Sequence, residues 1–212
     1  MRKTSMLRHA GVIVGAAVLI CTALALSSAA RGQAVTQAER DKGVKYLQAT
    51  RDGVAASVKG LSDEQLKWKA APDRWSVAET LEHIALAEEF TLTNITEKIM
   101  KAPAGAPDRD YVKIDAFVLT AIPDRSHKAH APNNLTPTGR WTPAETLDHF
   151  LKSREKTIAY LESAQDLRAH VVNGPMDQPM DGYEWLIFEG AHSERHTKQI
   201  EEVKADPNFP KK

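Results

Sequence analysis

Cysteine is nearly absent from the chain. Its 212 residues include a single cysteine, Cys21, which lies inside an apolar N-terminal run. If that run is removed on export, the remaining chain contains no thiol. A disulfide bond, a thiolate metal ligand and a cysteine nucleophile are then all excluded, and the chain suits an oxidising compartment.

An excess of charge of either sign is also missing. The sequence contains 28 Lys and Arg and 28 Asp and Glu, so its formal net charge is zero. Removal of residues 1–34 takes away four basic residues and no acidic one, which leaves 24 basic and 28 acidic residues, a net charge of −4. This balance gives no electrostatic reason to expect nucleic acid as a partner.

Several motifs of catalysis and nucleotide binding are absent as well. The sequence contains no Gly-x-Ser-x-Gly nucleophile elbow, no phosphate-cradling glycine loop and no Gly-x-Gly-x-x-Gly. Serine-hydrolase chemistry and nucleotide binding therefore receive no support.

The N-terminal residues have the layout of an export signal. Basic residues precede an uncharged apolar run over residues 10–26, and small residues follow it. This order predicts a cleaved signal peptide over residues 1–34 and one domain over residues 35–212, in the periplasm or secreted, with no membrane association after cleavage. An uncleaved membrane anchor is the alternative, because the run approaches the lower length limit for crossing a bilayer.

The rest of the chain has the pattern of an all-α protein. Apolar residues recur at spacings of three and four, and strict alternation is scarce. The sequence predicts long helices near residues 37–58, 76–101, 142–163 and 181–205, with short helical pieces near 62–69 and 111–120. Much of the proline and glycine falls in residues 102–140, which predicts a four-helix bundle with one long crossover connection.

An internal repeat supports this architecture. The sequence Arg-Trp-Ser-Val-Ala-Glu-Thr-Leu-Glu-His-Ile begins at Arg74 and returns 66 residues later, at Arg140, with seven of eleven positions identical. Each copy contains a Ser or Thr followed three residues later by Glu, the capping box that opens a helix. The 66-residue offset predicts a duplicated helix pair, in which each copy starts with a tryptophan, a cap and an apolar face. Convergence of two sequences on one good helix start is the alternative.

Three histidines carry the strongest functional signal. His192 and His196 lie four residues apart in the last predicted helix, which places both imidazoles on one face. His83 lies near the start of the second long helix. If the fold brings the three together, they form a metal site with open coordination positions. The alternative is a solvated histidine pair on a charged helix and a hydrogen-bonded histidine in the core.

Three other residues are candidates for the expected site, as ligands or as groups that orient the imidazoles. Glu189 and Gln199 lie one turn before and one turn after the pair, where they could ligate or orient the imidazoles. His149 is the repeat partner of His83 and is a candidate fourth ligand. The remaining histidines of the expected mature domain are interpreted as ordinary surface residues: His127, His130 and His170.

The zinc-protease pattern is not met. It requires His-Glu-x-x-His, with the general-base Glu directly after the first histidine. Here the sequence is His-Ser-Glu-Arg-His, so Glu194 is displaced by one position. On a helix this displacement turns the carboxylate by about 100°.

Two stretches resemble the DinB-like superfamily of four-helix bundles, the damage-inducible metal-binding family. One runs from Leu61 to His83 and the other from Trp185 to Val203, and the resemblance covers residues 40–205. It implies that His83, His192 and His196 hold a divalent metal ion. Zinc or nickel is expected first, and iron or manganese after them, since imidazole suits several of these metals.

The resemblance also frames the function. Characterised members include transferases and isomerases that use low-molecular-weight thiols such as bacillithiol or mycothiol. Those thiols are cytoplasmic, whereas this chain carries an export signal, so we expect a metal-dependent hydrolase of an unidentified small molecule. A thiol S-transferase and a non-catalytic metal-binding stress protein, with the site closed by His149 or Glu189, are the alternatives. Bundles of this size often dimerise through helix faces, so a homodimer is a further expectation.

Overall fold

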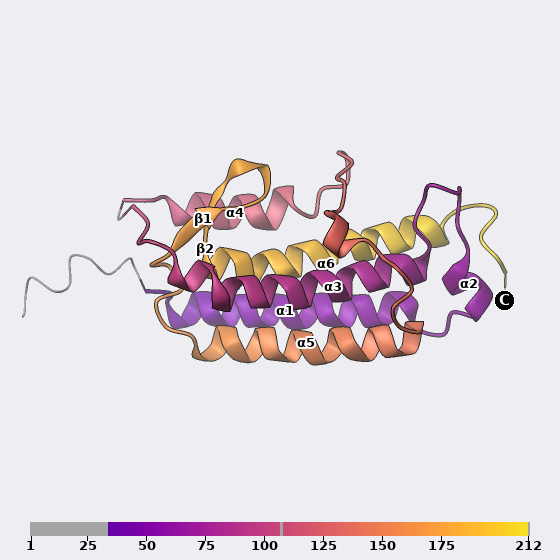
Figure 1. Ribbon diagram of the computed structural model, residues 1–212, viewed down its shortest axis with the longest axis horizontal. Coiled ribbons are helices and arrows are strands. Elements are labelled where there is room, and N and C mark those ends of the chain that lie inside the picture. Colours follow the sequence, from indigo (N-terminus) through magenta and orange to yellow (C-terminus); the bar gives the residue numbers. More distant parts are fainter. Residues whose placement is uncertain (1–33, 107, 212) are drawn as a thin grey trace, which may run out of the picture. The chain divides into compact units, whose positions relative to one another are not determined.

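Helices dominate the part of the chain that the computed structural model describes, residues 34–106 and 108–211. The α-helices are α1 (Gln37–Val58), α2 (Asp63–Lys67), α3 (Val77–Glu97), α4 (Tyr111–Ala121), α5 (Pro143–Ser163) and α6 (Gly182–Lys204), shown in Figure 1. Short 3-10 turns are η1 (Ile99–Lys101), η2 (Asn133–Leu135) and η3 (Pro175–Asp177), and two strands are β1 (Val171–Asn173) and β2 (Pro179–Asp181). The predicted all-α class is confirmed.

The predicted signal peptide, residues 1–34, lies outside the described residues except for Ala34. Within the described ranges, every helix is too short or too polar to span a lipid bilayer.

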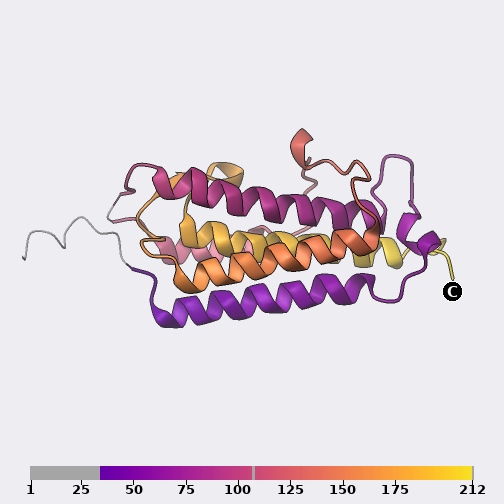
Figure 2. The ribbon, with the colours of Figure 1, turned by 60° about the horizontal axis from the view of Figure 1, so that its bottom comes forward.

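Four long helices form the bundle. α1 contacts α5 and α6, and α3 contacts the same two helices. Figure 2 shows α1 and α3 on opposite sides of α5 and α6. The first two long helices in the sequence, α1 and α3, therefore lie diagonally across the bundle from each other. The predicted long crossover carries the chain from α3 through α4 and η2 to α5. α4 packs on α6 outside the bundle.

Side-chain caps fix the starts of the four bundle helices. Each N-cap side chain accepts a hydrogen bond from the backbone N–H three residues on, and the Glu side chain at that position accepts one from the backbone N–H of the cap residue. The cap residues are Thr36, Ser76, Thr142 and Asp181. These reciprocal bonds satisfy N–H groups that a helix otherwise leaves without partners, which is why the predicted starts agree with the observed ones.

The repeat corresponds to two equivalent helices. α3 and α5 are each 21 residues long, and both ends of α5 lie 66 residues after the ends of α3. The offset of the helices equals the offset of the repeated sequence. The two copies of the repeat therefore open equivalent helices, and the duplication of a whole helix pair stays a prediction.

Two predictions of secondary structure were wrong. The helix expected to reach Lys101 ends at Glu97, and a 3-10 turn follows it. The stretch from Val171 to Asp181, which lies between the last two predicted long helices and for which no strand is predicted, contains an antiparallel hairpin of β1 and β2. Strands of three residues are too short to give a readable alternation of polar and apolar residues.

A buried polar layer divides the core into two apolar clusters. Leu47 and Leu186 belong to one cluster, and Val54 and Phe150 to the other. Arg154 of α5 lies between them with no exposed surface. Its guanidinium donates to all three of the other bundle helices. The acceptors are Glu88 Oε1 and Oε2, Leu47 O, Thr50 Oγ1, Glu189 O and Ser193 Oγ, at 2.7–3.1 Å.

We expect Arg154→Met to lower the free energy of unfolding by about 3–5 kcal/mol, because it leaves the buried Glu88 carboxylate without its cation. Urea unfolding followed by circular dichroism measures this change. As a control, Arg51→Met removes an arginine that pairs at the surface with Glu155, and it should cost less than about 1 kcal/mol. Similar losses in the two variants would contradict the importance of the buried pair.

Candidate metal centre

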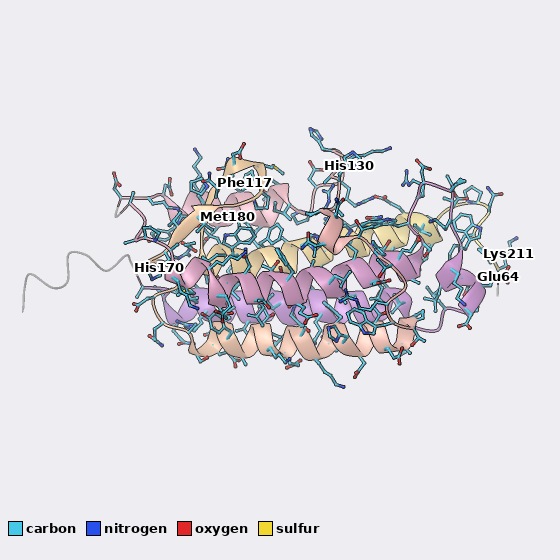
Figure 3. The ribbon with its side chains drawn as sticks, in the orientation of Figure 1. Glu64, Phe117, His130, His170, Met180 and Lys211 are labelled. Carbon is cyan, nitrogen blue, oxygen red and sulfur yellow. The ribbon has the colours of Figure 1, made fainter. Side chains whose placement is uncertain are left out.

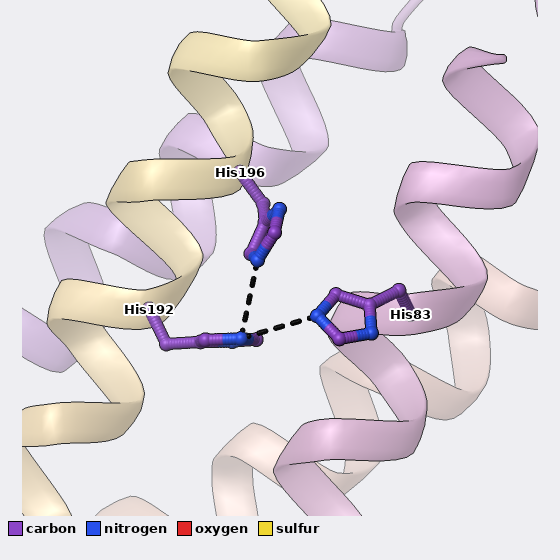
Figure 4. A group of neighbouring side chains, drawn as sticks. All are labelled: His83, His192 and His196. Carbon is purple, nitrogen blue, oxygen red and sulfur yellow. Dashed lines mark hydrogen bonds between the residues drawn. The ribbon is translucent and has the colours of Figure 1, made fainter. Parts of the chain in front are cut away.

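Three histidines meet between α3 and α6. The Nε2 atom of His192 lies 3.2 Å from Nε2 of His83 and 3.2 Å from Nε2 of His196. One nitrogen from each ring lies within 4.8 Å of the other two. Figure 4 shows the three rings pointing toward one another from the two helices. The structure thus brings together the three residues that the sequence selected.

Hydrogen bonds at the far side of two rings fix their tautomers. His83 Nδ1 lies 2.9 Å from Leu135 O, and a carbonyl oxygen can only accept, so His83 Nδ1 carries the proton. His196 Nδ1 lies 2.9 Å from Gln199 Oε1 and donates to it in the same way. In the neutral rings, both Nε2 atoms therefore present lone pairs to the centre of the group.

These lone pairs need a cation. Nε2 of His192 carries at most one proton in the neutral ring and can donate it to only one of the two neighbouring lone pairs. Burial and the neighbouring histidines lower the pKa of His192 well below its ordinary value, so a second proton on this ring is disfavoured. A metal ion accepts all three lone pairs at once, and the donor set therefore fits one.

The other two imidazoles are also held in the neutral, ligating form. Burial lowers the pKa of His83, against the hydrogen bond to Leu135 O. Burial, followed by the neighbouring His83, lowers the pKa of His196 to about 3. Metal binding at neutral pH therefore needs no proton to be removed from these rings.

The spacing of the nitrogens suits a small divalent ion. Nitrogens bound to one zinc ion at about 2.0–2.1 Å in a tetrahedral arrangement lie about 3.3 Å apart. The two Nε2 distances of 3.2 Å to His192 are close to this value. The three nitrogens can therefore ligate one ion with little movement of the side chains.

The members of the cluster differ in exposure. His83 and His196 are buried, whereas His192 is partly exposed. Aromatic rings flank it: the Trp75 ring lies 4.9 Å from the His83 ring, and the Phe188 ring lies 5.7 Å from the His192 ring. Both aromatic residues are half-buried, so they offer apolar surface beside the three nitrogens.

The crossover is tied down at the site by a residue that the sequence analysis missed. Glu82, next to His83, is buried, and its carboxylate accepts from the backbone N–H groups of Thr138, Gly139 and Arg140 at 2.8–3.1 Å. His83 holds η2 through Leu135 O, and Glu82 holds the segment that follows it. One sequence signal for this role exists, because Glu82 belongs to the repeated motif.

A second anchor holds the part of the crossover that directly follows α4. Arg195, between the two histidines of α6, donates to the backbone carbonyls of Ile122, Asp124 and His127. The crossover is thus bonded to both helices that carry the histidines. Its position depends on these side-chain contacts, which local sequence patterns do not encode.

The two candidate additional ligands are held elsewhere. His149 Nε2 lies 3.0 Å from Glu89 Oε2, and the His149 ring stacks on Trp141 with centroids 4.4 Å apart. Glu189 is buried in the polar layer, where burial and the Glu88 carboxylate raise its pKa well above the usual range. Among the described residues, only the three histidines form the metal-ligating group. Gln199, in contrast, orients His196 as predicted.

The remaining histidines differ from one another. His127 and His130 are exposed as expected, and Figure 3 shows His130 on the crossover at the outside of the fold. His170 was wrongly interpreted as an ordinary surface residue. It is half-buried, its backbone bridges to Ala104, and its Nδ1 contacts Ala102 O. This pairing joins distant parts of the sequence, so local sequence gave no sign of it.

Comparisons with known proteins agree with this fold. The model of a family described as the DinB superfamily matches residues 46–200. The uncharacterized protein YuaE of Bacillus subtilis (strain 168) is 28% identical over 149 residues, which cover 69% of this chain and 88% of YuaE. Among solved structures, YfiT from Bacillus subtilis, described as a probable metal-dependent hydrolase with an unusual four-helix bundle topology, matches with a TM-score of 0.51 and 16% identity, over 80% of this chain and 88% of that chain. At this identity the likeness to YfiT shows the fold alone.

We expect the metal-free protein to lose stability as the pH falls below about 6.5. His196 has a pKa of about 3 in the folded protein, whereas a histidine in the unfolded chain titrates near 6.5. Between these values the unfolded state binds a proton that the folded state does not. Each such histidine therefore lowers the free energy of unfolding by about 1.4 kcal/mol per pH unit in this window.

Urea unfolding in the presence of EDTA, between about pH 7.5 and about pH 5, measures this loss. His196→Gln removes one of the titrating groups, so its stability should fall less steeply with decreasing pH. Equal slopes for the two proteins would contradict the low pKa of His196.

We also expect Gln199→Leu to weaken zinc binding by about 10- to 100-fold, because His196 loses the acceptor that fixes its tautomer and orientation. Competition with a chelator of known affinity measures the dissociation constant. Gln48→Leu, at an exposed position of α1, is the matched control and should leave the constant unchanged. An unchanged constant in Gln199→Leu would show that His196 is oriented by packing alone.

Proposed function

The chain belongs to the DinB superfamily, and from its three-histidine site we propose that it is an exported, metal-dependent hydrolase of a small molecule. We expect the bound ion to be zinc or nickel first, and iron or manganese after them, since a set of neutral imidazoles suits the first two well. Export rests on the signal-like layout of residues 1–34. We propose no nucleic-acid partner, because the expected mature chain carries a net charge of −4.

One observation carries this proposal. Three Nε2 atoms converge, and no fourth His, Cys, Asp or Glu of the described residues joins the group. A structural zinc site is closed by four protein ligands, whereas a catalytic site keeps a position for water or substrate. His149 and Glu189, which could have closed the site, contact Glu89 and Glu88 instead. This arrangement favours catalysis over passive metal storage.

Residues of the chain would bind the ion and orient its ligands. His83, His192 and His196 hold the ion, and Leu135 O and Gln199 fix two of the rings. When bound, a divalent ion lowers the pKa of water and polarises a substrate carbonyl or phosphoryl oxygen.

The substrate would approach beside His192, the partly exposed member of the group. The neighbouring half-buried rings of Trp75 and Phe188 provide contact for an apolar part of the substrate. We therefore propose a substrate that carries a hydrolysable bond next to an apolar or aromatic group.

We expect about one metal ion per chain, lost in His192→Ala and kept in His149→Ala. His192 contributes an Nε2 atom to the group, whereas His149, the matched control, contacts Glu89 instead. Mass spectrometry of the metal content of untagged protein, after incubation with zinc or nickel, makes the comparison. Metal retained by His192→Ala, or absent from every protein, would refute the site.

The reaction class needs a separate test. Zinc-loaded and nickel-loaded protein are assayed on chromogenic carboxylic and phosphoric esters, and in parallel on an electrophilic acceptor with bacillithiol or mycothiol. The hydrolase proposal expects ester turnover that His192→Ala abolishes. If the acceptor reacts only when a thiol is present, the hydrolase proposal is wrong and the alternative, an S-transferase, takes its place.

A further inference from the structure

A hollow lies on the side of α6 away from the metal centre. It has a volume of about 440 Å³ and is bounded by α1, α4 and α6. Much of its lining is apolar or aromatic, from Tyr46, Ala49, Leu119, Tyr183 and Ile187. A volume of this size falls within the range of about 300–1,000 Å³ typical of small-molecule sites.

The hollow and the metal centre lie on opposite faces of α6. Tyr183 and Ile187, which line the hollow, each precede one of the α6 histidines by nine residues. Nine residues at about 100° per residue make about two and a half turns of the helix, so residues nine apart point to opposite sides of its axis. A molecule in the hollow would therefore not contact the three histidines.

The aromatic walls of the hollow are held in place. The Tyr46 hydroxyl donates to Glu194 at 2.8 Å, and the Tyr183 hydroxyl donates to Glu39 O at 2.8 Å. Gly190 gives room to the Tyr46 ring, because a Cβ atom at this glycine would lie 2.7 Å from two ring carbons. Side chains that are already ordered lose little further freedom when a ligand binds.

Two lysines and two acidic residues line the hollow. The acidic residues, Glu39 and Asp115, both pair with the buried Arg168, at 2.9 and 2.7 Å, in a network that also includes Asp181 and Glu184. Lys42 and Lys45 also line the hollow, are exposed, and take part in none of the ion pairs found among the described residues. Two ammonium groups beside an apolar lining complement a ligand that joins an apolar body to an anionic group.

We infer that this hollow binds a small amphipathic carboxylate. Its apolar body would contact Leu119 and Ile187, and its carboxylate would lie at Lys42 and Lys45. The limited volume and the ordered walls favour a small molecule over a segment of a protein partner. The inference does not depend on the metal centre, since no histidine lines the hollow.

Decanoate is the probe for the test. Calorimetric titration of the metal-free protein in EDTA should give saturable binding of one decanoate per chain. Lys42→Glu/Lys45→Glu should weaken binding at least tenfold. Lys59→Glu/Lys156→Glu, which makes the same charge change at two exposed lysines that do not line the hollow, should change it less than twofold.

Two further proteins locate the binding. Ala49→Trp places a ring in the hollow from an exposed position and should abolish binding without loss of thermal stability. His192→Ala should bind decanoate as the wild type does, which separates this site from the metal centre even if the proposed hydrolase is wrong.

Any one of four results would overturn the inference. Decanol, which lacks the charge, could bind as tightly as decanoate. Decanoate could bind equally to the protein with both lysines reversed, or lose its binding only in His192→Ala. Sedimentation equilibrium could reveal a dimer that Ala49→Trp separates, in which case the hollow is an interface between two copies of the chain.

Discussion

The buried guanidinium of Arg154 is the interaction on which the bundle depends most. It donates to groups on α1, α3 and α6 from its own helix, so one side chain joins all four bundle helices. Glu88 supplies the compensating charge, and burial together with Glu88 raises the pKa of Glu189, which disfavours a second negative charge in the layer. A shift of any helix along its axis would leave a buried polar group without a partner, which costs several kcal/mol.

The same layer sets the position of the metal centre. Glu88 follows His83 by five residues on α3, and Ser193, another partner of Arg154, directly follows His192 on α6. By fixing α3 and α6 along their axes at these points, the layer brings the two helices to the register in which the Nε2 atoms meet. The crossover then completes the site from outside, because Leu135 O and the segment that Glu82 holds lie against α3. Stability of the bundle and geometry of the site therefore have a common physical origin.

Local sequence was sufficient for some of this structure and not for the rest. Capping boxes such as Ser76 with Glu79 predicted helix starts, and the spacing of His192 and His196 predicted one ligating face, because both depend on neighbours within one helical turn. The diagonal placement of α1 and α3, and the pairing of Glu88 with Arg154, join residues far apart in the chain. A buried arginine looks in sequence like any polar residue on a solvated face, so its partners become visible only in the fold.

The two copies of the repeat explain why the described residues contain a single metal centre. In both copies a tryptophan ring packs against the histidine eight residues later, with centroids 4.9 Å apart for His83 and 4.4 Å apart for His149. The helices opposite them differ. α3 faces α6, which carries two histidines, whereas α5 faces α3 and α1, and α1 contains no histidine. His149 therefore contacts Glu89, and the same local motif joins the three-histidine group in one copy and meets a surface carboxylate in the other. The neighbouring helix, and not the motif, decides which chemistry each histidine performs.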